Sequence, residues 1–125
     1  MKATIYILLL LLISTNIHGE NFIIDKYRCS NYMYTSIIKH LFQIHNDKKE
    51  ISLFAKGDTI HVSYANKKQV LFYKISQSSN VFIKKRGKYI INLFIEKNKY
   101  DTIIKAYFIV VRKNKEIAEI SLTHI

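Results

Sequence analysis

The residues best able to carry chemistry in this chain are its single cysteine and its five histidines. A thiol becomes a catalytic nucleophile when an imidazole base and an orienting group lie within reach. Four histidines could supply the imidazole for Cys29: His40, His45, His61 and His124. The surrounding sequence, YRCSN, matches no local motif of that kind. We therefore expect Cys29 to be a free thiol that is either buried or engaged in an intermolecular disulfide.

Metal and acid–base sites are not predicted either. His40 and His45 are five residues apart, which places them about 140° apart around a helix axis. Zinc-binding pairs on one helix use a spacing of about three or four. The carboxylates mostly fall in turns or beside lysines, so no two of them are paired for general acid–base work. The sequence predicts a non-enzymatic protein without a cofactor or a metal.

The first 19 residues resemble a secretory signal peptide. Lys2 is followed by an apolar run from Ala3 to Ile13 and then by a polar segment that ends at Gly19. The apolar run is too short for a membrane-spanning helix, which needs roughly 20 residues. We expect residues 20–125 to form one exported domain, periplasmic or extracellular. With one cysteine this domain has no internal disulfide, so its stability must come from apolar packing.

The formal net charge of +11 suggests an anionic partner. The classes considered are an acidic protein, a lipid surface, a polyanionic glycan and nucleic acid. Export removes most nucleic-acid partners, and the Tyr and Phe residues near lysines are better explained as core residues, so nucleic acid is not favoured. A compositional origin of the lysines is the competing interpretation, because abundant Ile, Lys, Asn and Tyr is also what an AT-rich genome imposes.

The pattern of apolar residues predicts one helix followed by strands. Over residues 30–46 the apolar side chains recur at helical spacing along one stripe. From Glu50 onward the period changes to two, and the runs are rich in β-branched and aromatic residues, as strands are. Seven strands are expected: 51–55, 59–65, 69–76, 81–85, 89–96, 102–112 and 116–124.

Short connections between these strands favour hairpins over parallel crossovers. The expected fold is α+β, with an N-terminal helix packed on one face of an antiparallel meander of about six to seven strands. Two runs, 69–76 and 102–112, are apolar on both faces and are expected to be central. The sheet then either curls into a partial barrel or carries a second layer.

In such a meander alternate turns lie at the same end, and this sorts the charges. One set of turns carries Lys56, Asp58, Glu96, Lys97, Lys99 and Asp101, three cations and three anions. The other set, NKK, KKRGK and RKNK, carries nine cations and no anion. These nine are the predicted partner-binding residues: Lys67, Lys68, Lys84, Lys85, Arg86, Lys88, Arg112, Lys113 and Lys115. Lysines that simply suit exposed hairpin tips are the alternative explanation.

The expected function is therefore that of a small exported binding protein, such as an inhibitor or immunity-type protein, that holds an acidic macromolecular partner through this basic edge. Two alternatives stay open at this point. One is an envelope-surface protein that binds anionic lipid or glycan, and the other is a secreted effector that acts on a host protein.

Overall fold

The computed structural model of the protein describes residues 20–42, 50–64, 68–77 and 79–125. The expected signal peptide, His45 and Lys67 lie outside the described residues. Eight strands, one 3-10 turn and one short helix follow each other along the chain in this order: β1 (Glu20–Cys29), η1 (Tyr32–Tyr34), α2 (Thr35–Leu41), β2 (Glu50–Lys56), β3 (Thr59–Tyr64), β4 (Lys68–Lys74), β5 (Val81–Arg86), β6 (Tyr89–Lys97), β7 (Ile103–Arg112) and β8 (Lys115–His124).

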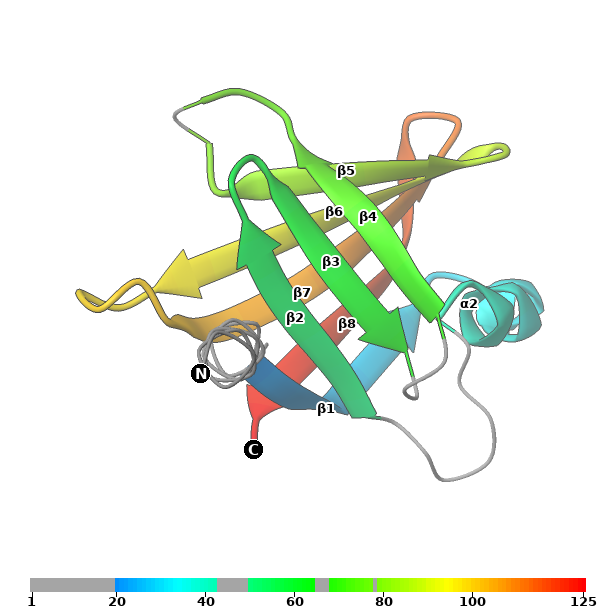
Figure 1. Ribbon diagram of the computed structural model, residues 1–125. Helices are drawn as coiled ribbons and strands as arrows, with labels where there is room; N and C mark the ends of the chain where they lie inside the picture. The colour runs from blue at the N-terminus through cyan, green and yellow to red at the C-terminus, as the bar shows by residue number, and fades with distance from the viewer. Residues whose placement is uncertain (1–19, 43–49, 65–67, 78) are drawn as a thin grey trace, which may run out of the picture.

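The strands form a closed antiparallel barrel in which each strand pairs with its neighbours in the sequence (Figure 1). β1 closes the barrel against β8, with Phe22 opposite His124 and Cys29 opposite Ala118. The predicted antiparallel meander is confirmed, but there are eight strands rather than six or seven. Because the barrel is closed, no strand is central. The second apolar face of β7 lies on the outside, where Ile104 is exposed.

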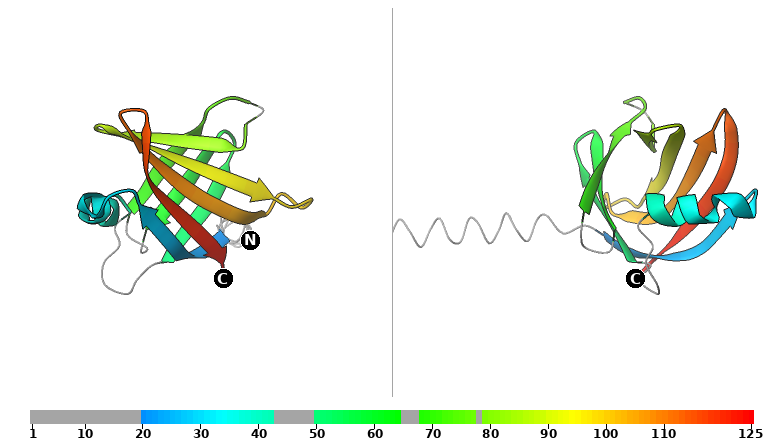
Figure 2. Two further views of the ribbon diagram at one scale, coloured as in Figure 1. Left: turned by 180° about the vertical axis from the view of Figure 1, so that it is seen from behind. Right: turned by 90° about the vertical axis from the view of Figure 1, so that its right-hand side faces the viewer.

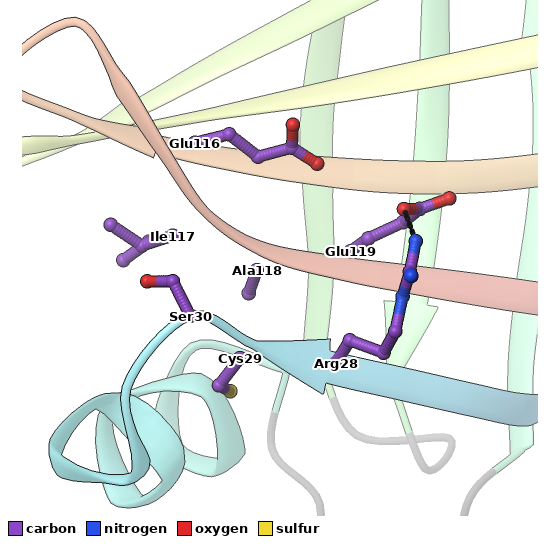
Figure 3. A pocket seen from close by; sticks show the side chains of 7 residues that line it. All are labelled: Arg28, Cys29, Ser30, Glu116, Ile117, Ala118 and Glu119. Atoms are coloured by element: carbon purple, nitrogen blue, oxygen red, sulfur yellow. Dashed lines mark hydrogen bonds and ion pairs between the residues drawn. The ribbon is translucent and has the colours of Figure 1, made fainter.

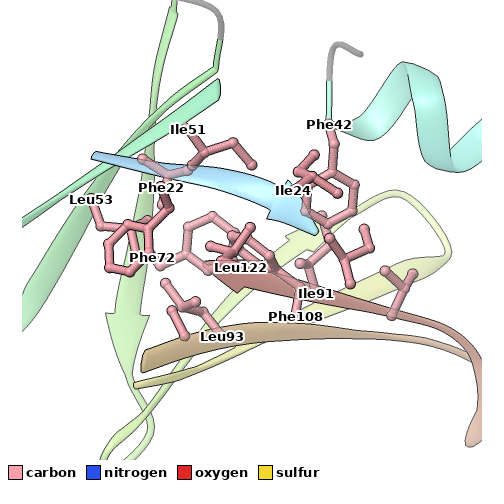
Figure 4. Packing of buried hydrophobic residues seen from close by; sticks show 14 of the residues in the cluster. Phe22, Ile24, Phe42, Ile51, Leu53, Phe72, Ile91, Leu93, Phe108 and Leu122 are labelled. Atoms are coloured by element: carbon pink, nitrogen blue, oxygen red, sulfur yellow. The ribbon is translucent and has the colours of Figure 1, made fainter. Parts of the chain in front are cut away.

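The barrel interior is filled by the inward side chains that the two-residue period predicts. On β3, Ile60, Val62 and Tyr64 are buried, whereas the residues between them are half-buried. Side chains from several strands and from the end of α2 meet in one hydrophobic cluster (Figure 4). An eight-stranded barrel encloses a space just wide enough for such side chains. The alternating pattern thus builds a packed core.

The expected helix differs in length and position from what the sequence predicted. It is not N-terminal, because β1 precedes it, and its α-helical part covers Thr35–Leu41 after the η1 turn. Its apolar stripe is confirmed where it is described, since Ile38, Leu41 and Phe42 are buried. The helix lies across one end of the barrel rather than along one face of the sheet (Figure 2, right). We call the end of the barrel that α2 covers the helix end.

No helix within the described ranges is both long enough and apolar enough to span a membrane.

Candidate partner-binding surface

The antiparallel order fixes which connections share an end of the barrel. The connection between β1 and β2, which carries α2, lies at the same end as the β3–β4, β5–β6 and β7–β8 connections. The β2–β3, β4–β5 and β6–β7 connections lie at the opposite end. The turns KKRGK and RKNK therefore belong to the helix end, as does Lys68 at the start of β4. Lys39 and His40 of α2, which are exposed, lie there too.

Two basic hairpins stand next to each other at the helix end. In the β5–β6 hairpin, Arg86 pairs with Tyr89, and Tyr89 in turn pairs with Arg112 of β7. Arg112 then pairs with Lys115 across the β7–β8 hairpin. Directly opposite residues on neighbouring strands point to the same face, so these four side chains form one row across β5 to β8.

The two arginines of this row are held by different surroundings. The guanidinium carbon of Arg112 lies 5.7 Å from the centre of the Tyr89 ring, a cation–π arrangement. The Nε atom of Arg112 is buried and has no hydrogen-bond partner among the described residues. Arg86 is exposed at the tip of β5. The row therefore contains one cation fixed against an aromatic ring, Arg112, and two cations exposed to solvent, Arg86 and Lys115.

The β5 strand carries cations on both of its faces. Lys84 lies opposite the buried Ile91, and Lys85 lies opposite Ile90, so the two lysines point to different sides of the sheet. Lys84 is half-buried, while Lys85, Lys88, Lys113 and Lys115 are exposed. Lys68 begins β4, and Lys67 lies outside the described residues.

The ion pairs of the described chain leave these cations unneutralised. Arg28 binds Glu119 at 2.6 Å, and Lys97 binds Asp101 at 3.2 Å. A third pair joins His124 to Glu20. None of the described ion pairs includes a predicted partner-binding residue. The Lys97–Asp101 pair belongs to the opposite end, where cations and anions balance.

A buried phenol, Tyr64, lies at the last position of β3, toward the helix end of the barrel. The hydroxyl of Tyr64 is buried and, among the described residues, has no hydrogen-bond partner. Burial raises the pKa of the Tyr64 phenol well above its ordinary value of 10.0, and the positive charge of Arg86 offsets this in part.

The chemistry considered for Cys29 is not assembled in the described residues. Cys29 is a half-buried free thiol near the end of β1 and lines a shallow depression of about 350 Å³ (Figure 3). The described residues around this depression include Ser30, Glu116 and the Arg28–Glu119 ion pair, but no histidine. No group of three or more potential metal ligands occurs in the described part of the chain.

Sequence reasoning missed two contributors to the helix end. Lys39 and His40 join it because α2 lies across the end of the barrel, and a helix placed on one face would have carried them elsewhere. A second feature is a groove of about 590 Å³ between β4 and β5, which Lys84, Lys85 and Arg86 line on one side. No signal in the local sequence marks this groove.

Comparison with protein-family models, with curated proteins and with solved structures found no match.

Proposed function

We propose that this protein is a small exported binding protein, without catalytic activity, that holds an acidic macromolecular partner at the helix end. An inhibitor or immunity-type protein fits this description. The observation that carries the proposal is the pair of adjacent basic hairpins, β5–β6 and β7–β8, whose cations have no carboxylate partner among the described residues. Export rests on the sequence of residues 1–19 alone.

Electrostatics supports this assignment. Cations gathered within a few Debye lengths of about 8 Å create a strong local potential that attracts an acidic surface and repels a basic one. The opposite end offers no such field. Lys97 is paired there with Asp101, and the turns at that end also carry the carboxylates of Asp58 and Glu96. An acidic partner is therefore steered toward one end of the barrel.

A charge-reversal experiment with a matched control tests the proposal. The test variant combines Lys85→Glu, Arg86→Glu and Lys113→Glu at the helix end. The control combines Lys56→Glu, Lys99→Glu and Lys105→Glu, which changes the net charge equally but alters cations outside the predicted partner-binding set. Binding of fluorescent poly-glutamate is measured for residues 20–125 at low salt.

We expect the helix-end variant to lose at least about tenfold in affinity and the control to lose far less, because local complementarity adds to the effect of net charge. Equal losses in the two variants would show that net charge alone attracts the probe and would overturn the proposal. Circular dichroism of both variants checks that each one still folds.

Salt dependence and the choice of probe distinguish binding of anionic lipid or glycan from binding of an acidic protein. Attraction by charge alone fades at about 0.5 M salt, where screening is strong. Tighter binding of a heparin fragment or of phosphatidylserine vesicles than of poly-glutamate would favour that alternative over an acidic protein.

A further inference from the structure

The junction between β4 and β5 has the shortest ladder among the described strands of the barrel. These strands pair only through Tyr73 with Ile83 and through Lys74 with Phe82. Yet β4 pairs with β3 from Lys68 to Tyr73, and β5 pairs with β6 from Val81 to Arg86. Toward the helix end, each strand therefore has a partner on one side only. Figure 1 shows β4 and β5 diverging in this direction.

The groove of about 590 Å³ lies where β4 and β5 diverge. It is lined on one side by Gln69, Val70 and Leu71 of β4 and on the other by Lys84, Lys85 and Arg86 of β5. In an antiparallel sheet, successive residues present their N–H and C=O groups to alternate sides. Part of the backbone of Lys84–Arg86 thus faces the groove without a strand to bond to. The groove joins free backbone donors and acceptors to a run of cations.

We propose that an extended acidic segment of a partner protein enters this groove and adds as a strand to the free edge of β5. The inference rests on the proposed function and specifies how the acidic partner is held. Strand addition supplies main-chain hydrogen bonds, and alternate side chains of the added strand supply specificity. An acidic residue opposite the exposed Lys85 forms a cross-strand ion pair, because directly opposite Cβ atoms are about 5 Å apart. Lys84 and Arg86 on either side of it add to the positive charge along the groove.

Other occupants of the groove fit these residues less well. A second copy of this chain that paired through the same edge of β5 would bring the same three cations against them, and like charges directly opposite each other are destabilising. Lipid headgroups and glycan chains carry anions but lack the alternating peptide N–H and C=O groups that match a strand edge. An acidic peptide satisfies both the charge and the backbone.

The test uses two peptides of identical charge with residues 20–125 of the protein. The first is a peptide of about ten residues that alternates Glu and Thr, long enough for an ordinary strand. The second has the same sequence with N-methyl groups on three successive central amides, which block both of its edges for strand pairing. Affinity is measured by fluorescence polarisation, and amide hydrogen exchange locates the bound peptide.

We expect the unmodified peptide to bind at least about tenfold more tightly than the methylated one, because only the first can form main-chain hydrogen bonds with β5. It should also slow exchange of groove-facing amides within Lys84–Arg86. Lys85→Glu should reduce the difference in affinity between the two peptides. Lys113→Glu, a change outside the groove lining, should lower the affinity of both peptides by the same factor.

The outcomes separate this inference from the proposed function. Equal binding of the two peptides, or exchange protection that avoids Lys84–Arg86, would overturn strand addition and leave the basic helix end intact as a binding surface. Failure of both peptides would also overturn it, while the poly-glutamate experiment judges the proposed function independently. Equal protection of Lys84–Arg86 by a heparin fragment or by phosphatidylserine vesicles would show a general anion groove instead.

Discussion

The ring of Phe42, which follows α2, meets the ring of Phe108 on β7 edge to face, with 4.8 Å between the ring centroids. Phe42 also contacts Tyr64 of β3 at 5.7 Å between ring centroids. A helix of one or two turns is not stable alone in water, so α2 depends on tertiary packing. These two contacts, together with the buried side chains of Ile38 and Leu41, fix the helix to the barrel interior.

Replacing this ring tests how much the helix contributes to the fold. We expect Phe42→Ala to lower the free energy of unfolding by roughly 3–5 kcal/mol, because it removes a buried ring and leaves a cavity. Urea denaturation of residues 20–125 measures the change. Tyr32→Ala is the control, since Tyr32 is 86% exposed and its loss should leave stability nearly unchanged. Similar losses in both variants would contradict the anchoring role.

Tyr64 supports a prediction about an unpaired buried hydroxyl. Removing a buried polar group that has no partner also removes its desolvation penalty, so Tyr64→Phe should be neutral or should stabilise the protein by up to about 1 kcal/mol. Tyr100→Phe, at a residue that is 74% exposed, is the control. A loss of stability in Tyr64→Phe alone would show that the hydroxyl has a partner in solution.

The same residue predicts a response to alkaline pH. Burial raises the pKa of Tyr64 in the folded state above the ordinary value of 10.0, so above that pH the unfolded chain ionises first. The contribution of Tyr64 to stability is complete below pH 10 and falls as the pH rises further. Denaturation from pH 9 upward should therefore show a smaller decline in Tyr64→Phe than in the wild type. An identical decline would contradict the raised pKa.

The strand pattern was readable because the side-chain period of two is local. Residues 59–65 alternate without interruption, and residues 89–96 keep large apolar side chains at every second position; β3 and β6 are found there. β1 was missed because its alternation breaks. Phe22 and Ile24 are buried, but a bulge between Ile24 and Lys26 shifts the register, so Tyr27 and Cys29 continue the inward face at odd positions.

Two features of the barrel could not be predicted from the local sequence pattern: its closure through β1 and β8, and the divergence of β4 from β5. Pairing of β1 with β8 joins Phe22 to His124, and no local pattern encodes a contact over that distance in sequence. Residues 69–76 and 81–85 look like ordinary strands in sequence, so their divergence is equally invisible. The position of the helix at the barrel end follows from closure and was missed with it.

The closing strands predict a pH-dependent contribution to stability. The Nε2 atom of His124 on β8 lies 2.6 Å from a carboxylate oxygen of Glu20 on β1. This hydrogen bond, and then the one with the backbone oxygen of Ile125, raises the pKa of His124 above its ordinary 6.5. The stabilisation is complete below pH 6.5 and is lost as the pH rises through the folded-state pKa.

NMR titration of the His124 ring checks this directly, with an expected midpoint above 6.5. Glu20→Gln should return the midpoint toward the ordinary value and flatten the loss of stability above pH 6.5. Glu50→Gln serves as the control, because Glu50 is exposed and belongs to none of the described ion pairs. An unchanged midpoint in Glu20→Gln would rule out the hydrogen bond as the cause.

At the tip of the β7–β8 hairpin, Lys113 contributes a positive charge for binding but adopts a backbone conformation that lowers stability. Lys113 adopts a φ of 51° and Asn114 a φ of 61°, in a two-residue turn between the paired Arg112 and Lys115. Such turns favour Asn or Gly, since other residues pay about 1 kcal/mol or more in this conformation. We expect Lys113→Asn to raise the free energy of unfolding by up to about 1 kcal/mol and to weaken poly-glutamate binding.

Lys88 provides the matched control for that prediction. It occupies the tip of the neighbouring β5–β6 hairpin and is not among the described non-glycine residues with positive φ. Lys88→Asn removes the same charge without relieving strain, so it should weaken binding without raising stability. Equal stability changes in Lys88→Asn and Lys113→Asn would show that relief of charge repulsion, rather than of backbone strain, is responsible. A destabilised Lys113→Asn would contradict the strained conformation itself.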